Sequence, residues 1–202
     1  MSEKSTHVDP SALGLLGLAM VTLVASSQKL GITTGVSLII PWAIFLGALA
    51  QLMAGALDYK KGNVFGATAF CGYGFFWLAV STTWMINLGA LGPHLQAVAD
   101  SRQLAFGFLG YLIFTLFMTV GSMETNKVLL IDFILIDFLF LGLTVSTFIP
   151  EGSTHELFHY MAAYAELGIS LVSFYGMGAN VLNNHFGYAF LPIGKPSGIF
   201  VK

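Results

Sequence analysis

Long apolar runs, separated by short polar segments, divide the chain into six parts. The hydrocarbon core of a bilayer is about 30 Å thick and is crossed by about 20 apolar residues in a helix. Each run reaches or approaches this length before glycine, proline or charged residues interrupt it. The predicted spans are residues 11–27, 36–57, 64–88, 104–123, 128–149 and 156–182.

Spans of this length are predicted to be helices. Lipid offers no hydrogen-bond partner, so every backbone N–H and C=O must be satisfied within the segment. The first run is followed by five similar ones and is therefore not expected to be a cleaved signal peptide. We predict an all-α integral membrane protein with one six-helix transmembrane domain over residues 1–202 and short terminal tails.

Composition supports this class and excludes others. Hydrophobic residues make up 56% of the 202-residue chain and charged residues 9%, against about 25% charged in a soluble domain. The formal charge is −2, and the eight lysines and arginines are scattered, so we expect no nucleic-acid partner. Cys71 is the single cysteine, which rules out an intrachain disulfide.

The charged turn within "AGALDYKKGNVFGATAF", residues 54–70, indicates the orientation. Positive residues collect on the cytoplasmic side of membrane proteins, and an even number of spans places both termini on the same side. With both termini cytoplasmic, only Lys29 and Arg102 face outward. The other six face the cytoplasm: Lys4, Lys60, Lys61, Lys127, Lys195 and Lys202.

Several polar side chains fall within the spans, where they are costly and usually face the bundle interior or a wet cavity. A threonine hydroxyl there can simply bond to its own helix, and a glutamine can bond to a neighbouring helix. These side chains are Thr22, Gln51, Tyr73, Thr115, Thr119, Asp132, Asp137, Glu166 and Asn180.

The three carboxyl groups, Asp132, Asp137 and Glu166, have no lysine or arginine inside any predicted span. Low dielectric stabilises such a group as the neutral acid, which can donate a hydrogen bond. One hypothesis is a proton relay. A subunit interface or a wet vestibule would also accommodate these groups.

The sequence "HELFH", His155 to His159, matches the pattern in which two histidines on one helical turn bind zinc and Glu156 activates water. An intramembrane zinc metalloprotease is therefore an alternative hypothesis. A catalytic zinc needs a third protein ligand, and the predicted orientation places His155 at the outer mouth of the last helix. We accordingly predict no metal, no cofactor and no catalytic residues. A membrane sensor or scaffold without transport is a further alternative.

Five ordered motifs resemble the acetate uptake transporter family of the succinate-acetate permease type. The resemblance covers almost the whole chain. The motifs are "DPSALGLLGLAM" (9–20), "QLMAGALDYKKGNVFGATAF" (51–70), "GYGFFW" (72–77), "FTLFM" (114–118) and "VLNNHFGYAFLPIG" (181–194).

The resemblance implies six helices per protomer, a homo-hexamer in the cytoplasmic membrane, and a pathway for acetate, related monocarboxylates or succinate in each protomer. It implies a constriction at Leu18, Tyr73 and Ile136. The family signature covers Asp9, Pro10, Leu13, Gly14, Leu15 and Asn63, and the pathway also includes Thr22, Gln51, Phe70 and Asn180. Asp9 stands where the family usually has Asn, and Ala12 where it has a second Pro.

We predict a transporter, not an enzyme, whose partners are a small carboxylate and membrane lipid. Gln51, Tyr73 and Thr22 can donate hydrogen bonds to a carboxylate. An apolar constriction that stays dry until it is wetted is a known gating device. No fixed positive charge lies in the predicted spans to hold the anion tightly, so substrate binding should be weak and passage fast. The sequence leaves channel-like and proton-coupled transport both open.

Overall fold

The computed structural model describes residues 9–200, and Lys4 and Lys202 lie outside this range. Residues 9–200 form helices and loops without strands. Six spans are long and apolar enough to cross a membrane. They are α1 (Ser11–Lys29), α2 with η1 and α3 (Ile39–Lys60), α4 (Val64–Asn87), α6 (Ser101–Ser122), α7 (Lys127–Phe148) and α8 (Ser153–Phe186). The all-α class with six membrane helices is confirmed.

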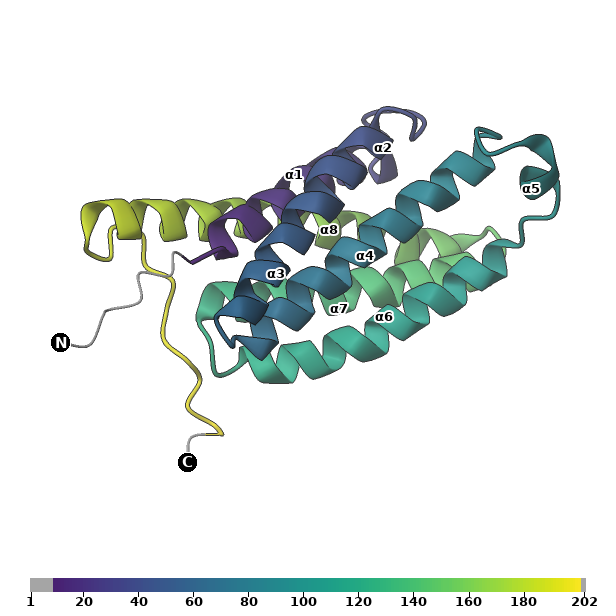
Figure 1. Ribbon diagram of the computed structural model, residues 1–202. Helices are drawn as coiled ribbons and strands as arrows, with labels where there is room; N and C mark the ends of the chain where they lie inside the picture. Colours follow the sequence, from purple (N-terminus) through teal and green to yellow (C-terminus); the bar gives the residue numbers. More distant parts are fainter. Residues whose placement is uncertain (1–8, 201–202) are drawn as a thin grey trace.

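The spans pack as a ring. α1 packs against α8, α8 against α7, α7 against α6, and α3 against both α4 and α1. A smaller contact between α4 and α6 closes the ring. The start of α1 and the segment that follows α8 lie at one end of the bundle, and the short helix α5 (Pro93–Ala97) lies at the other (Figure 1).

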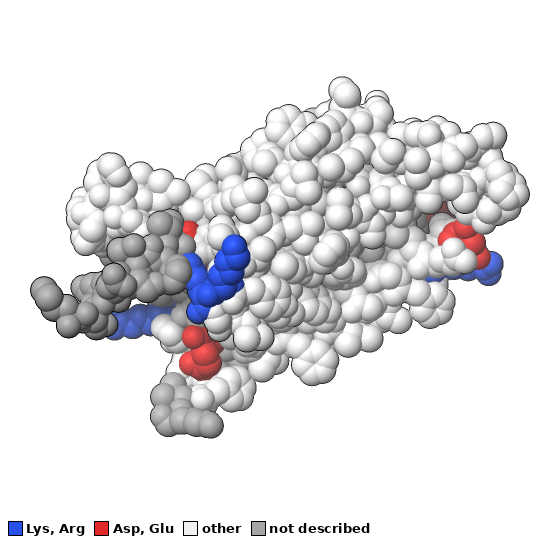
Figure 2. All heavy atoms as spheres, viewed as in Figure 1, with Lys and Arg blue, Asp and Glu red and all other residues white. Residues whose placement is uncertain are grey.

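On the face in view, charged residues lie at the two ends of the bundle, and the long middle shows none (Figure 2). At one end, the Lys127 backbone N–H donates to the Ile193 carbonyl (3.0 Å), and its ammonium donates to Ser197 Oγ (2.8 Å). At the other end, Arg102 donates to Asp100 at 2.7 Å, which lowers the pKa of that carboxyl, located just before α6. This distribution suits a molecule whose middle lies in lipid.

Polar caps define where several helices begin. The Asp9 carboxylate accepts a hydrogen bond from the Ser11 N–H at 3.0 Å, so the aspartate at this signature position holds the first turn of α1. Asn63 Oδ1 accepts from the Gly66 N–H at 3.2 Å and caps α4. The turn that carries Lys60 and Lys61 therefore ends at a defined cap.

The second span differs most from a regular helix. It begins at Ile39 as α2 (Ile39–Trp42), continues as the π-helical segment η1 (Ala43–Ala50), and returns to α-helix in α3 (Gln51–Lys60). π-helical segments are rare and often occur at functional sites. η1 packs closely on α1, because a Cβ at Gly17 would meet the backbone carbonyl of Leu46. The end of η1 directly precedes Gln51.

Candidate functional site

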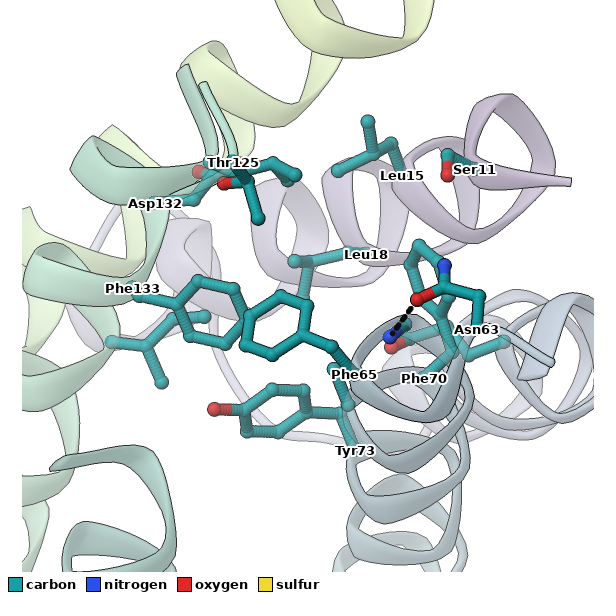
Figure 3. A pocket seen from close by; sticks show the side chains of 15 residues that line it. Ser11, Leu15, Leu18, Asn63, Phe65, Phe70, Tyr73, Thr125, Asp132 and Phe133 are labelled. Carbon is teal, nitrogen blue, oxygen red and sulfur yellow. Dashed lines mark hydrogen bonds between the residues drawn. The ribbon is translucent and has the colours of Figure 1, made fainter. Parts of the chain in front are cut away.

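A cavity of about 170 Å³ enters the bundle from the end where α1 begins. We call it the proximal cavity. A water molecule needs on the order of 10–15 Å³ in this measure, so the cavity can hold several waters or a small carboxylate. Figure 3 shows its side chains converging from α1, α4 and α7. They are Ser11, Leu15, Leu18, Gln51, Asn63, Phe65, Gly66, Ala69, Phe70, Tyr73, Thr125, Leu129, Asp132, Phe133 and Ile136.

The three residues of the predicted constriction all line this cavity. Leu18 is 8% exposed, and Tyr73 and Ile136 are each 4% exposed. The Tyr73 ring stacks on Phe140, with centroids 6.4 Å apart, and packs edge to face against Phe114, with centroids 5.5 Å apart. The cavity is thus bounded by a packed apolar layer.

A second cavity, of about 150 Å³, lies on the far side of that layer, and we call it the distal cavity. Its lining includes Phe76 and Trp77 of α4 and Leu139 of α7. These residues follow Tyr73 and Ile136 by three or four positions, and each helical residue rises about 1.5 Å. The apolar layer between the two cavities is therefore about one helical turn thick.

Gln51 brings an unpartnered amide to the proximal cavity. Its side chain is fully buried, and neither Nε2 nor Oε1 has a hydrogen-bond partner within residues 9–200. Unsatisfied buried amides are unusual, since each such group costs free energy. The amide can therefore bind water or a small polar solute in the cavity.

The other two expected donors are engaged. Thr22 donates to the Leu18 carbonyl of its own helix at 2.7 Å and lines neither cavity. The Tyr73 hydroxyl lies 2.9 Å from Thr115 Oγ1, which itself donates to the Tyr111 carbonyl at 2.7 Å. Tyr73 is therefore the donor in the first of these bonds. Its ring forms part of the cavity wall, and its hydroxyl is engaged in the hydrogen bond to Thr115.

The three intramembrane carboxyls lie in different places. Asp132 lines the proximal cavity, accepts a hydrogen bond from Ser173 at 3.1 Å through Oδ2, and has no partner at Oδ1 within the described residues. Asp137 accepts from Thr119 at 2.7 Å between α6 and α7 and lines neither cavity. Only Asp132 is placed to meet a solute in the proximal cavity.

The expectation that all three carboxyls lack a positively charged partner is wrong for Glu166. Lys29 Nζ lies 2.9 Å from Glu166 Oε2. The prediction was wrong because α1 continues two residues beyond the predicted span and brings Lys29 to the buried carboxylate of α8. The statement that no positive charge lies in the spans is corrected with it.

Other predicted residues fall at the edge of the site. Phe70 lines the proximal cavity and packs on Gly14, where a Cβ would meet its ring. Leu15 and Asn63 line the cavity as well. Asn180 instead donates to the Gly176 carbonyl at 3.0 Å and lines neither cavity. Pro10 accepts hydrogen bonds from the Leu13 and Gly14 N–H groups and thereby starts α1.

Sequence reasoning missed several lining residues. Phe65 and Phe133 pack edge to face, with centroids 5.6 Å apart, and form one wall of the proximal cavity. Ser173 supports Asp132 from α8. Phe65 and Phe133 look like ordinary apolar span residues in a sequence, so only the packing of α4 against α7 reveals them.

Among the described residues, the structure places no third zinc ligand with His155 and His159. His155 and His159 lie with parallel rings, their centroids 6.1 Å apart, and His159 Nε2 donates to the Lys29 carbonyl at 2.9 Å. Within residues 9–200, no group of three or more His, Cys, Asp or Glu side chains could hold a metal ion. His159 instead ties the start of α8 to the end of α1.

The family model of the GPR1/FUN34/yaaH family matches residues 1–195. The chain is 34% identical over 189 residues to the succinate-acetate/proton symporter SatP of Escherichia coli K12, covering 93% of this chain and 95% of the symporter. It is 31% identical over 152 residues to acetate permease A of Emericella nidulans, covering 71% of this chain and 50% of that permease.

A solved structure of the bacterial acetate channel SatP is similar, with a TM-score of 0.82 and 33% identity, covering 92% of this chain and 98% of the channel. These findings confirm the resemblance read from the five motifs. Together with the six apolar helices, they make the chain a multi-pass plasma-membrane protein. It belongs to the GPR1/FUN34/yaaH family.

Proposed function

We propose that the protein carries acetate and related short carboxylates, including succinate, across the plasma membrane through each protomer, and that it is a transporter and not an enzyme. The observation that carries this proposal is the pair of cavities separated by one apolar turn, with the unpartnered Gln51 amide in the proximal cavity. The printed names of the relatives, a succinate-acetate/proton symporter, an acetate channel and an acetate permease, support it.

The proximal cavity suits an amphipathic anion. Gln51 Nε2 donates to a substrate oxygen, while Leu18, Tyr73 and Ile136 surround the methyl group. The apolar layer that follows is unfavourable for a bare charge, because desolvating a carboxylate is costly. Crossing is easier for the neutral acid.

Asp132 can supply the proton for this step. A neutral Asp132 carboxyl donates its proton to the substrate carboxylate, giving a neutral acid and an aspartate that the Ser173 hydroxyl stabilises. A proton from the adjoining solution then restores Asp132. Asp137 and Glu166 take no part in this relay, because neither lines the proximal cavity.

The proposal includes orientation and assembly. Lys60, Lys61, Lys127 and Lys195 mark the end at which the proximal cavity opens, and the positive-inside rule assigns that end to the cytoplasm. The distal cavity then faces outward. We propose that the chain forms a single six-helix domain with both termini cytoplasmic, and that the protomers form a hexamer, as the family resemblance implies.

Labelled-acetate flux into proteoliposomes, with and without an imposed pH gradient, tests the function. Saturable flux above that of protein-free liposomes is expected, and a gradient should accelerate it if Asp132 relays protons. Saturable flux that is indifferent to the gradient would favour channel-like passage. Flux equal to that of protein-free liposomes would refute the proposal and leave a sensor or scaffold role.

A further inference from the structure

The distal cavity contains an ion pair that the route described above does not use. Lys29, the last residue of α1, and Glu166, near the middle of α8, are the two charged residues among the described side chains that line it. Their Nζ and Oε2 atoms lie 2.9 Å apart, with Glu166 1% exposed and the Lys29 side chain 15% exposed. The remaining lining is mostly apolar and aromatic.

Lys29 has unused donor capacity. A lysine ammonium carries three hydrogens, and the structure gives it one acceptor, Glu166 Oε2. The cavity adjoins both members of the pair, so a solute there meets the ammonium directly. The Gln28 amide lines the same cavity and can supply a second donor.

The pair is a poor candidate for a purely structural tie. Burying a carboxylate and an ammonium costs desolvation that their attraction often does not recover. α1 and α8 are already joined by close packing, by the Ser170 hydroxyl donating to the Ala19 carbonyl at 2.9 Å, and by His159 on the Lys29 carbonyl. The ion pair therefore adds little that the helix contact lacks.

We infer that Lys29 is the carboxylate-binding site of the distal cavity and that Glu166 is its tethered occupant. The Glu166 side chain presents to Lys29 the same carboxylate group that an incoming substrate carries. Substrate and Glu166 therefore compete for one ammonium, and Lys29 holds the substrate only while Glu166 is displaced. The inference rests on the proposed transport of short carboxylates and assigns the outer end of that route.

Competition of this kind keeps external binding weak. A free ammonium in an apolar cavity would hold an anion tightly and slow its release, whereas a tethered carboxylate at high effective concentration replaces each departing substrate. The substrate methyl group would then face Phe76 and Trp77 of the same cavity. The site fits a small monocarboxylate.

The test measures the half-saturating acetate concentration for entry into right-side-out membrane vesicles, in which the distal cavity faces the medium. Glu166→Gln keeps the shape and an acceptor oxygen but removes the competing charge, so the half-saturating concentration should fall about tenfold. Lys29→Gln should raise it about tenfold. In the double variant, Glu166→Gln should have no further effect, because its action requires Lys29.

Glu156→Gln is the matched control, because Glu156 is an exposed carboxylate in the first turn of the same helix and does not line the distal cavity. It should leave the half-saturating concentration unchanged. In inside-out vesicles, where acetate enters at the proximal cavity, Glu166→Gln should also have little effect. The amount of folded protein in each preparation is measured by size-exclusion chromatography.

Two results would overturn the inference while leaving acetate transport intact. One is wild-type saturation that neither Glu166→Gln nor Lys29→Gln changes. The other is an effect of Glu166→Gln that persists in full when Lys29 is already Gln. Wild-type vesicles without saturable acetate entry would instead refute the proposed function itself, and the inference with it.

Discussion

The Tyr73 hydroxyl donates to Thr115 Oγ1 at 2.9 Å and so joins α4 to α6. This bond holds the end of the Tyr73 side chain, whose ring lines the proximal cavity and packs against Phe114 and Phe140. The ring, and not the hydroxyl, therefore faces the proposed route. The two parts of this side chain can be tested separately.

Tyr73→Phe should keep acetate flux within about twofold of wild type, because the ring remains. It should lower stability by about 1 kcal/mol through the lost hydrogen bond. Tyr73→Ala should increase the entry of larger carboxylates relative to acetate, because the apolar layer is opened. Flux ratios for acetate, propionate and butyrate, together with thermal unfolding in detergent, check both. Equal selectivity in Tyr73→Ala and wild type would contradict the proposed constriction.

Gln51→Leu removes the unpartnered amide of the proximal cavity with little change in volume. Loss of one hydrogen bond to a charged oxygen, about 1.5–3 kcal/mol, should raise the half-saturating acetate concentration at least tenfold. Thr22→Val is the control, because Thr22 bonds to its own helix and lines neither cavity. Initial rates over a range of acetate concentrations distinguish the two. A larger effect of Thr22→Val would contradict the assignment.

Asp132→Asn should abolish the acceleration of acetate entry by a pH gradient, because an amide cannot give up a proton and regain it. Flux without the gradient should persist. Asp137→Asn, which changes a carboxyl outside both cavities, should leave the response intact. The measurement is acetate accumulation in proteoliposomes under an imposed gradient. A full gradient response in Asp132→Asn would eliminate this residue as the proton carrier.

Gly17→Ala should destabilise the protein, because the added Cβ meets the backbone carbonyl of Leu46 in η1 and must push α1 away. Overpacking of this kind costs typically 1–3 kcal/mol. Gly178→Ala in α8 is the matched control, since its Cβ would make only an ordinary contact, 3.8 Å from Leu191 Cδ1. The measurement is the unfolding midpoint of each of the two variants in detergent. Equal midpoints would show that α1 and η1 have room to separate.

The six spans were predictable because length and apolarity alone determine which segments cross a bilayer. The π-helical segment before Gln51 was not, because its sequence, "AIFLGALA", is as apolar as any span and its register depends on packing against Gly17 and Trp77. α5 was missed as well. It is a five-residue helix within the loop that joins α4 to α6.

The candidate site was predictable in part. The family resemblance pointed to Leu18, Gln51, Tyr73 and Ile136, and the structure brings all four to one cavity. Which donor is free was not predictable. In the sequence, Gln51 and Thr22 are both polar residues within apolar spans. Only the hydrogen-bond geometry shows that Thr22 is already satisfied and that the Gln51 amide is not. Pairings across the bundle depend on which helices are neighbours, which no local pattern reveals.

Blocking the route between the two cavities tests the central claim most directly. Leu18→Trp places a bulky ring at the apolar layer. Leu23→Trp places the same ring on the outer face of the same helix, where Leu23 is 39% exposed. Acetate flux per folded protein in proteoliposomes should fall to the protein-free level in Leu18→Trp and stay near wild type in Leu23→Trp. Undiminished flux through folded Leu18→Trp would show that acetate takes another path.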